Sequence, residues 1–337
     1  MISAGFSNSL VFLPRNFRTP LDLSMRGDPI ERWTILWLTV GWLMISLFLH
    51  ACSAEKTNLP PERERTGGRA AYVHTRAIVS LGPRPPGSAA LSETREYITS
   101  QLERHGWYVV PQPFTRTVAA IGKPVTFTNL IARYEGASES QIKILLGAHI
   151  DSKFYPDQHF VGADDAASAA GIILEIARQL SKEPEKASRL ELVFFDGEEA
   201  FGESITPVDG LYGSKYYASH WRKSARKPAA GIILDMVGHR NLSIRYPSDT
   251  PPFLENALLS AARNAGAEHR FKKALNPILD DHVPLNNAGI PTLDFIGDFS
   301  QFPWWHTEAD NLKRISIESL EISLQITSEM ITGLLEE

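Results

Sequence analysis

Two adjacent glutamates follow an apolar stretch in the middle of the sequence. The segment 193–203, VFFDGEEAFGE, passes from apolar residues into Asp196, Gly197, Glu198 and Glu199. Carboxylates placed close together repel one another unless a cation binds them or a proton neutralises one of them. A divalent metal ion resolves this conflict, because one glutamate can bind the ion while its neighbour stays free as a general acid or base.

Other acidic residues and histidines stand at similar points of the chain. Each follows an apolar run or opens a helical pattern, and they are His149, Asp151, Asp164, Asp165, Asp235, His239 and His306. Taken singly, each has an ordinary explanation as a helix cap, a hydrogen-bonded core histidine or a solvated loop residue. Their occurrence at the ends of several segments indicates one shared site instead.

The composition limits the ligands and partners of such a site. The 337 residues contain a single cysteine, which excludes an intramolecular disulfide and a cysteine-rich zinc module. Any metal is therefore bound by His, Asp and Glu, and zinc accepts these ligands in a tetrahedral catalytic site with one open position. The net charge of −5 gives no basic surface for nucleic acid, so we expect no nucleic-acid partner.

Alternating strand and helix patterns must position these residues. Apolar runs of strand length occur at 125–134, 142–150, 190–195, 231–238 and 292–297, and helical patterns occur at 71–81, 89–105, 166–180, 211–220, 251–265 and 316–335. Strands that are apolar on both faces and alternate with helices predict a mainly parallel sheet covered on both sides. Ligand sites in such sheets lie beyond the carboxyl ends of the strands, where the acidic residues and histidines occur.

The first 70 residues differ in character from the rest. A run of 17 uncharged residues, 33–49, suits a short membrane-spanning helix or a long signal-peptide core. The following LHAC resembles the cleavage box of bacterial lipoproteins, in which Cys52 becomes the lipidated first residue, and an uncleaved membrane anchor is the alternative. Both predict export, with the protein periplasmic or attached to the membrane through this segment alone.

These patterns divide the chain into three parts. Residues 1–51 comprise an over-extended start before Met25, followed by the signal peptide or anchor. Residues 52–70 are polar, contain Pro and Gly, and predict a flexible tether. Residues 71–337 form the predicted catalytic domain, with no internal repeat.

Several motifs resemble, in order and spacing, those of the animal-type glutaminyl-peptide cyclotransferases, which share a fold with zinc-dependent aminopeptidases. They lie within residues 72–337 and read GPRPPGS, GAHIDSK, FVGADDAAS, FFDGEEAF, DGLYGSKYYA, LDMVG, DDHVPL and WHTEADN. The resemblance implies an α/β fold, a three-layer sandwich with a central mixed, mostly parallel sheet flanked by helices. It also implies an acyltransferase that converts the N-terminal glutamine of a peptide or protein into pyroglutamate and releases ammonia.

The resemblance also implies roles for individual residues. The ligands of a single zinc ion per chain are Asp165, Glu199 and His306. Glu198 is the implied acid/base, and Asp235 and Asp281 form an acidic pair that supports it. The aromatic residues implied at the substrate are Phe302, Trp304 and Trp305.

One pocket wall departs from the family. The family carries a tryptophan in the segment after the glutamates, and residues 200–210 of this chain contain none. Trp304 either compensates for that tryptophan or packs in the core, where aromatic residues near a site are common.

Two other functions compete with cyclisation. A two-zinc aminopeptidase of the same fold would use His149 with Asp165 and Glu199 for the pair of ions, Asp235 for the second ion, and Glu198 to activate water. A non-catalytic binding domain on a lipid anchor would require the glutamate pair to be part of an ordinary surface. The motifs FFDGEEAF and DDHVPL favour the cyclotransferase, in which His149 supports the ligands without binding metal.

Overall fold

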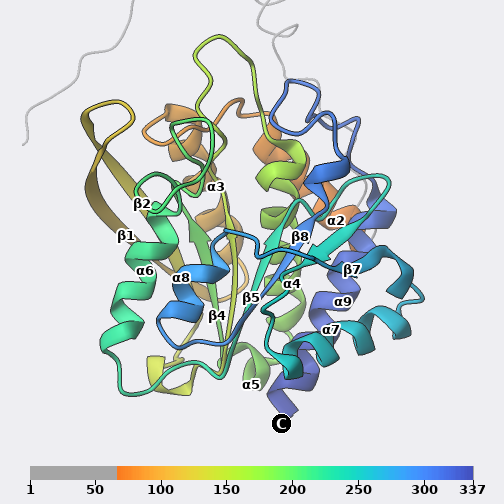
Figure 1. The fold of residues 1–337 in the computed structure, drawn as a ribbon. Coiled ribbons are helices and arrows are strands. Elements are labelled where there is room, and N and C mark those ends of the chain that lie inside the picture. The colour runs from red at the N-terminus through yellow and green to blue at the C-terminus, as the bar shows by residue number, and fades with distance from the viewer. Residues whose placement is uncertain (1–66, 337) are drawn as a thin grey trace, which may run out of the picture. The chain divides into compact units, whose positions relative to one another are not determined.

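A mixed eight-stranded sheet forms the centre of the computed structural model, which describes residues 67–336 (Figure 1). The strands lie in the order β1 (Trp107–Val118), β2 (Lys123–Tyr134), β4 (Leu190–Phe195), β3 (Ile144–His149), β5 (Ala230–Asp235), β8 (Thr292–Gly297), β6 (Ile244–Tyr246) and β7 (Phe271–Lys273). The pairs β3/β4, β3/β5, β5/β8 and β6/β7 are parallel, and the other three are antiparallel. The predicted mixed, mostly parallel sheet is confirmed.

Helices cover both faces of this sheet. One apolar core joins the sheet to α2 (Gly68–Val79), α3 (Ala89–Glu103), α4 (Ala169–Leu180), α7 (Pro252–Asn264) and α9 (Ile317–Glu336). A second core joins the opposite face to α6 (Tyr212–Lys223) and α8 (His282–Asn287). Figure 1 shows the two groups of helices on opposite sides of the strands, so the predicted three layers are present. The short helix α5 (Pro184–Ala187) precedes β4.

The four central strands have mostly apolar sequences because they are buried on both faces. Every residue of β3, β4, β5 and β8 is buried, because helices cover both faces of each strand. These strands are parallel, so their carboxyl ends lie at one edge of the sheet. The polar residues that follow them therefore converge on that edge.

Three of the differences from the predicted elements lie at the start of α2, at the turn before α4 and at the edge strand β1. Helix α2 begins at Gly68, three residues before the predicted domain start at Ala71. The helix predicted at 166–180 begins at Ala169, after a wider turn over Ala163–Ser168 in which Asp165 has non-helical backbone angles. The strand β1 was not predicted, and its prolines Pro111 and Pro113 fit its place at the edge of the sheet, where a missing N–H donor is tolerated.

The membrane prediction lies outside the described residues. The apolar run 33–49, Cys52 and most of the predicted tether fall in residues 1–66. Within residues 67–336, none of the helices combines the length and apolarity that a membrane crossing requires.

Candidate active site

The two glutamates lie at a sharp turn directly after β4. Gly197 has a left-handed backbone with φ of 76°, and a Cβ atom there would lie 2.4 Å from the Phe127 ring, so this position requires glycine. The amides of Glu198 and Glu199 then donate to the two carboxylate oxygens of Asp151 at 3.2 and 3.3 Å. Asp151 follows β3, so it attaches the glutamate turn to the neighbouring parallel strand.

A second buried carboxylate holds the turn that carries Asp165. Asp310 accepts hydrogen bonds from the amides of Asp164 at 2.9 Å and Asp165 at 3.2 Å. Asp310 lies four residues after His306, so this contact joins two segments that are far apart in the sequence. The buried guanidinium of Arg84 fixes the preceding residues by donating to the carbonyls of Val161 and Gly162 at 2.7 and 3.1 Å.

Asp165, Glu199 and His306 meet at the carboxyl edge of the sheet. His306 Nε2 lies 3.4 Å from Asp165 Oδ2 and 3.2 Å from Glu199 Oε1. One donor atom from each residue lies within 4.8 Å of the others, and Glu199 Oε1 is buried without a hydrogen-bond partner. Burial alone favours the neutral ring, but the two carboxylates raise the pKa of His306 to about 9. Two carboxylates and one imidazole, with one carboxylate oxygen buried and unpaired, form a donor set that fits a zinc ion.

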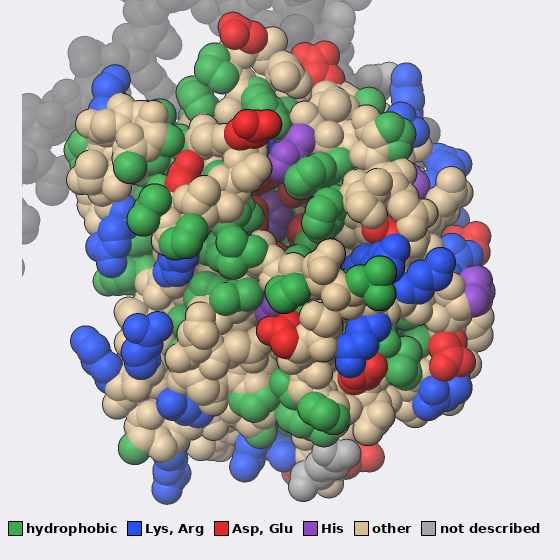
Figure 2. All heavy atoms as spheres, viewed as in Figure 1, with side chains coloured by type: hydrophobic (Ala, Val, Ile, Leu, Met, Phe, Trp, Pro, Cys, Tyr) green, Lys and Arg blue, Asp and Glu red, His purple; other side chains and the backbone are tan. Residues whose placement is uncertain are grey.

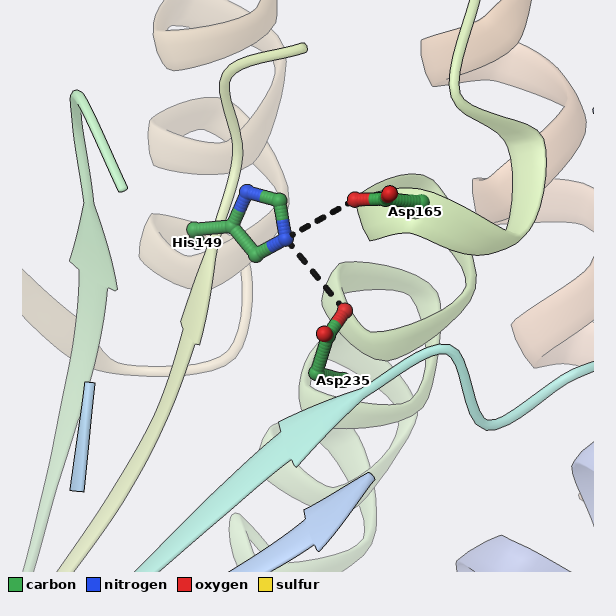
Figure 3. Close-up of side chains that lie close together, drawn as sticks. All are labelled: His149, Asp165 and Asp235. Carbon is green, nitrogen blue, oxygen red and sulfur yellow. Dashed lines mark hydrogen bonds and ion pairs between the residues drawn. The ribbon is translucent and has the colours of Figure 1, made fainter. Parts of the chain in front are cut away.

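His149, Asp165 and Asp235 form a second possible donor set, which shares Asp165 with the first (Figure 3). Its Nε2 lies 3.2 Å from Asp165 Oδ1 and 3.3 Å from Asp235 Oδ1. These three residues also offer donor atoms within 4.8 Å of one another. Asp165 therefore turns one oxygen toward His306 and the other toward His149, an arrangement that gives room for one ion or for a bridged pair.

Glu198 stays outside the three-donor set and lies near His149. Its Oε2 lies 3.9 Å from His149 Nδ1, and its side chain is almost fully buried in the pocket wall. Burial is the main cause that raises the pKa of Glu198 well above its ordinary value, and the charges of Asp280 and Glu199 act in the same direction. A carboxylate with a raised pKa can both accept and return a proton near neutral pH.

A pocket opens above these residues. Figure 2 shows histidine and acidic side chains at the floor of a hollow that apolar side chains surround. The pocket has a volume of about 280 Å³ and is lined by Asp165, Glu198, Glu199 and His306 among others. Trp305 also lines it, stacks on the His306 ring at 4.0 Å and keeps 37 % of its surface exposed.

Comparison with known proteins agrees with this geometry. Residues 129–331 match the model of peptidase family M28. The glutaminyl-peptide cyclotransferase of Bothrops jararaca is 31 % identical over 286 residues, covering 72 % of this chain and 76 % of that protein. The bovine glutaminyl-peptide cyclotransferase is 29 % identical over 292 residues, covering 72 % of this chain and 77 % of that protein. The chain belongs to peptidase family M28, among its glutaminyl-peptide cyclotransferases.

Solved structures of a glutaminyl cyclase and of an exopeptidase have a similar fold. The structure of Porphyromonas gingivalis glutaminyl cyclase matches 80 % of this chain and 99 % of its own, with a TM-score of 0.72 and 28 % identity. A Zn-dependent exopeptidase from Parabacteroides distasonis matches 78 % of this chain and 97 % of its own, with a TM-score of 0.70 and 30 % identity. The fold is thus shared by cyclases and peptidases, and the residues at the site decide between them.

Of the three aromatic residues implied at the substrate, one lines the pocket and two lie in the core. Of the three, Trp305 alone lines the pocket of this M28 family member. Trp304 and Phe302 are buried; Trp304 stacks on Phe302 and on His239, and Phe302 contacts the His239 ring at a tilt, with ring centroids 4.6–4.7 Å apart. Trp304 therefore packs in the core and does not replace the family's pocket tryptophan. The wall after the glutamates is instead formed by Glu203, Ser204 and Ile205.

The two adjacent aspartates of the DDHVPL motif, Asp280 and Asp281, lie in different places relative to the pocket. Asp280 lines the pocket, whereas Asp281 is buried behind it and does not. Burial first, and then the charge of Asp280, raises the pKa of Asp281 well above its ordinary value. Asp235 also lines the pocket, and burial raises its pKa to about 7, with Asp280 among the contributing charges. Asp280, and not Asp281, therefore shares the pocket lining with Glu198 and Asp235.

Sequence reasoning gave no role to several residues that line the pocket or hold the turns around it. Asp151 was noted without a role, and Arg84, Lys153, Asp280 and Asp310 were not noted. Lys153 lines the pocket, with Nζ 2.9 Å from the Ala200 carbonyl and 3.6 Å from Glu199 Oε2. The sequence did offer a sign that these residues matter, because each lies in one of the family-like motifs GPRPPGS, GAHIDSK, DDHVPL or WHTEADN.

Proposed function

We propose that this chain is a zinc-dependent glutaminyl-peptide cyclotransferase that uses one zinc ion for catalysis. Its substrates are peptides and proteins with an N-terminal glutamine, and its products are the pyroglutamyl chain and ammonia. The observation that carries the proposal is the division of the glutamate pair. Glu199 joins a three-donor set, while Glu198 stays outside that set in the wall of the same pocket.

Asp165, Glu199 and His306 would hold the zinc ion. When bound there, zinc supplies a Lewis acid that polarises the side-chain amide carbonyl of glutamine. Trp305 forms an apolar wall over His306, against which the methylene groups of the glutamine side chain can pack.

Glu198 then moves the proton that the reaction requires. The α-amine nitrogen forms a bond to the side-chain amide carbon, and the bond from that carbon to the amide nitrogen breaks. Glu198 accepts a proton from the attacking amine and delivers it to the departing nitrogen, which leaves as ammonia. The same carboxylate acts in both steps, so no water molecule is consumed.

The two-zinc aminopeptidase is the second candidate. In its favour, His149, Asp165 and Asp235 form a donor set beside the first one. Against it, curated relatives across most of the catalytic region are glutaminyl-peptide cyclotransferases. The charges of Asp280 and Asp281 also reach Glu198, and such a cluster of acids fits a residue that must hold a proton.

The glutamates provide the test. Glu198→Gln keeps size and polarity but cannot carry a proton, so kcat for ammonia release from a glutamine-initiated dipeptide should fall ~100-fold or more. Its zinc content should equal that of the wild type, whereas Glu199→Gln should lose one equivalent of zinc. If Glu198→Gln loses the metal and Glu199→Gln keeps both metal and activity, the two roles are reversed.

A further inference from the structure

The mouth of the pocket combines apolar residues with one acid. The lining residues that are exposed, and therefore lie at the open end, are Glu203, Ser204, Pro277, Leu279 and Trp305. The other acids that line the pocket are buried, and Figure 2 shows acidic side chains at the floor of the hollow. Glu203 is the charged member of the exposed group, so the mouth offers one negative charge beside an apolar surface.

The loop that carries Glu203 has a fixed path. The carboxylate of the buried Asp209 accepts hydrogen bonds from the amides of Phe201 at 3.1 Å and Gly202 at 2.8 Å. Lys215 Nζ donates to two further carbonyls of the same loop at 3.1 and 2.8 Å. These hydrogen bonds lie on both sides of Glu203 in the chain, so the backbone presents its side chain to the pocket at a defined position.

Glu203 has no partner within the described protein. Among residues 67–336, its carboxylate forms neither an ion pair nor a hydrogen bond. The lysine that lines the same pocket, Lys153, is buried and already engaged, because its Nζ donates to the Ala200 carbonyl at 2.9 Å and lies 3.6 Å from Glu199 Oε2. The charge of Glu203 is therefore available to a ligand.

The wall that contains Glu203 is also where the chain departs from its family. Residues 200–210 contain no tryptophan, and Glu203, Ser204 and Ile205 are the residues of that segment that line the pocket. A wall with a carboxylate accepts different side chains from an aromatic wall. A long side chain with a terminal cation suits it, because the methylene groups pack on apolar surface while the charge reaches the carboxylate.

We propose that Glu203 selects substrates in which lysine or arginine follows the N-terminal glutamine. The inference rests on the proposed cyclotransferase function, in which the glutamine side chain reaches the zinc ligands at the buried end of the pocket. The next residue then lies at the mouth, where its methylene groups pack on the apolar surface and its cation pairs with Glu203. An acidic residue at the same place is disfavoured, because it brings two like charges together.

Glutamine-initiated tripeptides that differ only at the second residue test this selection. Gln-Lys-Ala, Gln-norleucine-Ala and Gln-Glu-Ala present a cation, a neutral chain of similar length and an anion. With wild-type enzyme at low salt, kcat/KM for ammonia release should be highest for the lysine peptide, by ~2–5-fold over norleucine, the scale of an exposed ion pair. The advantage should lie in KM, because the pair forms equally in the ground and transition states, and it should shrink at high salt.

Charge variants assign the selection to one residue. Glu203→Gln should remove the advantage of the lysine peptide, and Glu203→Lys should reverse the order in favour of the glutamate peptide. The matched control Glu135→Gln alters an exposed glutamate that follows β2, at the edge of the sheet opposite the pocket, and should keep the wild-type order.

The outcomes separate this inference from the proposed function. Equal kcat/KM for the lysine and norleucine peptides, with ammonia released from both, overturns the selection and leaves the cyclotransferase intact. A lysine advantage that persists in Glu203→Gln overturns it as well. Release of ammonia from none of the peptides by the wild-type enzyme contradicts the cyclotransferase, and this inference with it.

Discussion

Neighbouring glutamates can have different tasks because their side chains meet different partners. Glu199 Oε1 lies 3.2 Å from His306 Nε2, while the nearest ring nitrogen to Glu198 is Nδ1 of His149 at 3.9 Å. The turn at Gly197 and the two hydrogen bonds to Asp151 fix both backbones, so the division does not depend on side-chain flexibility alone. A metal ligand needs negative charge, whereas a proton carrier needs a suitable pKa.

Replacement of two histidines separates the one-zinc site from the two-zinc site. His306→Ala should lose one equivalent of zinc, because His306 belongs to the catalytic set. His149→Ala should keep the zinc content of the wild type, because in a one-zinc site His149 contacts Asp165 and Asp235 without binding the metal itself. Atomic absorption on both purified variants checks this, and loss of one equivalent from His149→Ala would support the aminopeptidase.

At this scale, the family resemblance of the motifs predicted the three residues that meet in one donor set, but not the direction of every side chain. Asp280 and Asp281 are adjacent and chemically identical, and the fold alone decides that Asp280 faces the pocket. Trp304 and Trp305 are likewise adjacent, and only Trp305 faces the pocket. Sequence spacing cannot make this choice in a loop, because a loop has no fixed period.

At the scale of elements, two carboxylates hold the segments that carry the ligands. Asp151 binds the turn after β4, and Asp310 binds the turn before α4. Each accepts two backbone amides, so each fixes a main-chain path that regular secondary structure does not support. The proposed catalytic residues are thus positioned by two buried acids, Asp151 and Asp310, that do not line the pocket.

Asp310→Asn tests this support. The new amide group replaces one of two acceptor oxygens, so one buried amide of the Asp164–Asp165 turn loses its partner, at a cost of ~1–3 kcal/mol in unfolding free energy. We expect a lower Tm and weaker zinc binding, measured by scanning calorimetry and zinc titration. The exposed control Asp157→Asn should leave both unchanged, and wild-type zinc affinity in Asp310→Asn would contradict the supporting role.

Elements with strong hydrophobic patterns were predicted well. The strands predicted at 190–195 and 292–297 coincide with β4 and β8, because fully buried parallel strands are continuous apolar runs. The three-residue strands β6 and β7 are too short to give a pattern. The turn at Ala163–Ser168 has a helical composition, and its distortion comes from the long-range contact with Asp310.

At the scale of the whole molecule, the catalytic region follows a segment that predicts export. We propose that Cys52 carries a lipid that attaches the enzyme to a membrane. The support is the uncharged run 33–49 followed by LHAC, and the absence of any other cysteine in the sequence.

Cys52→Ser tests the anchor. Metabolic labelling with a fatty acid should mark the wild-type protein and leave the variant unlabelled, and the variant should be released or remain unprocessed. The activity of the catalytic region should be unchanged in detergent extracts, since Cys52 lies outside it. A wild-type chain that is unlabelled but membrane-bound, and still contains residues 33–49, would show a spanning anchor instead.

The most direct test of the cyclotransferase is the identity of its products. Wild-type enzyme incubated with a glutamine-initiated dipeptide should release one ammonia for each pyroglutamyl dipeptide formed, with no free amino acids, as measured by mass spectrometry and an ammonia assay. Glu198→Gln serves as the control and should form neither product at a comparable rate. Release of free glutamine and of the second amino acid, without ammonia, would contradict the account and identify an aminopeptidase.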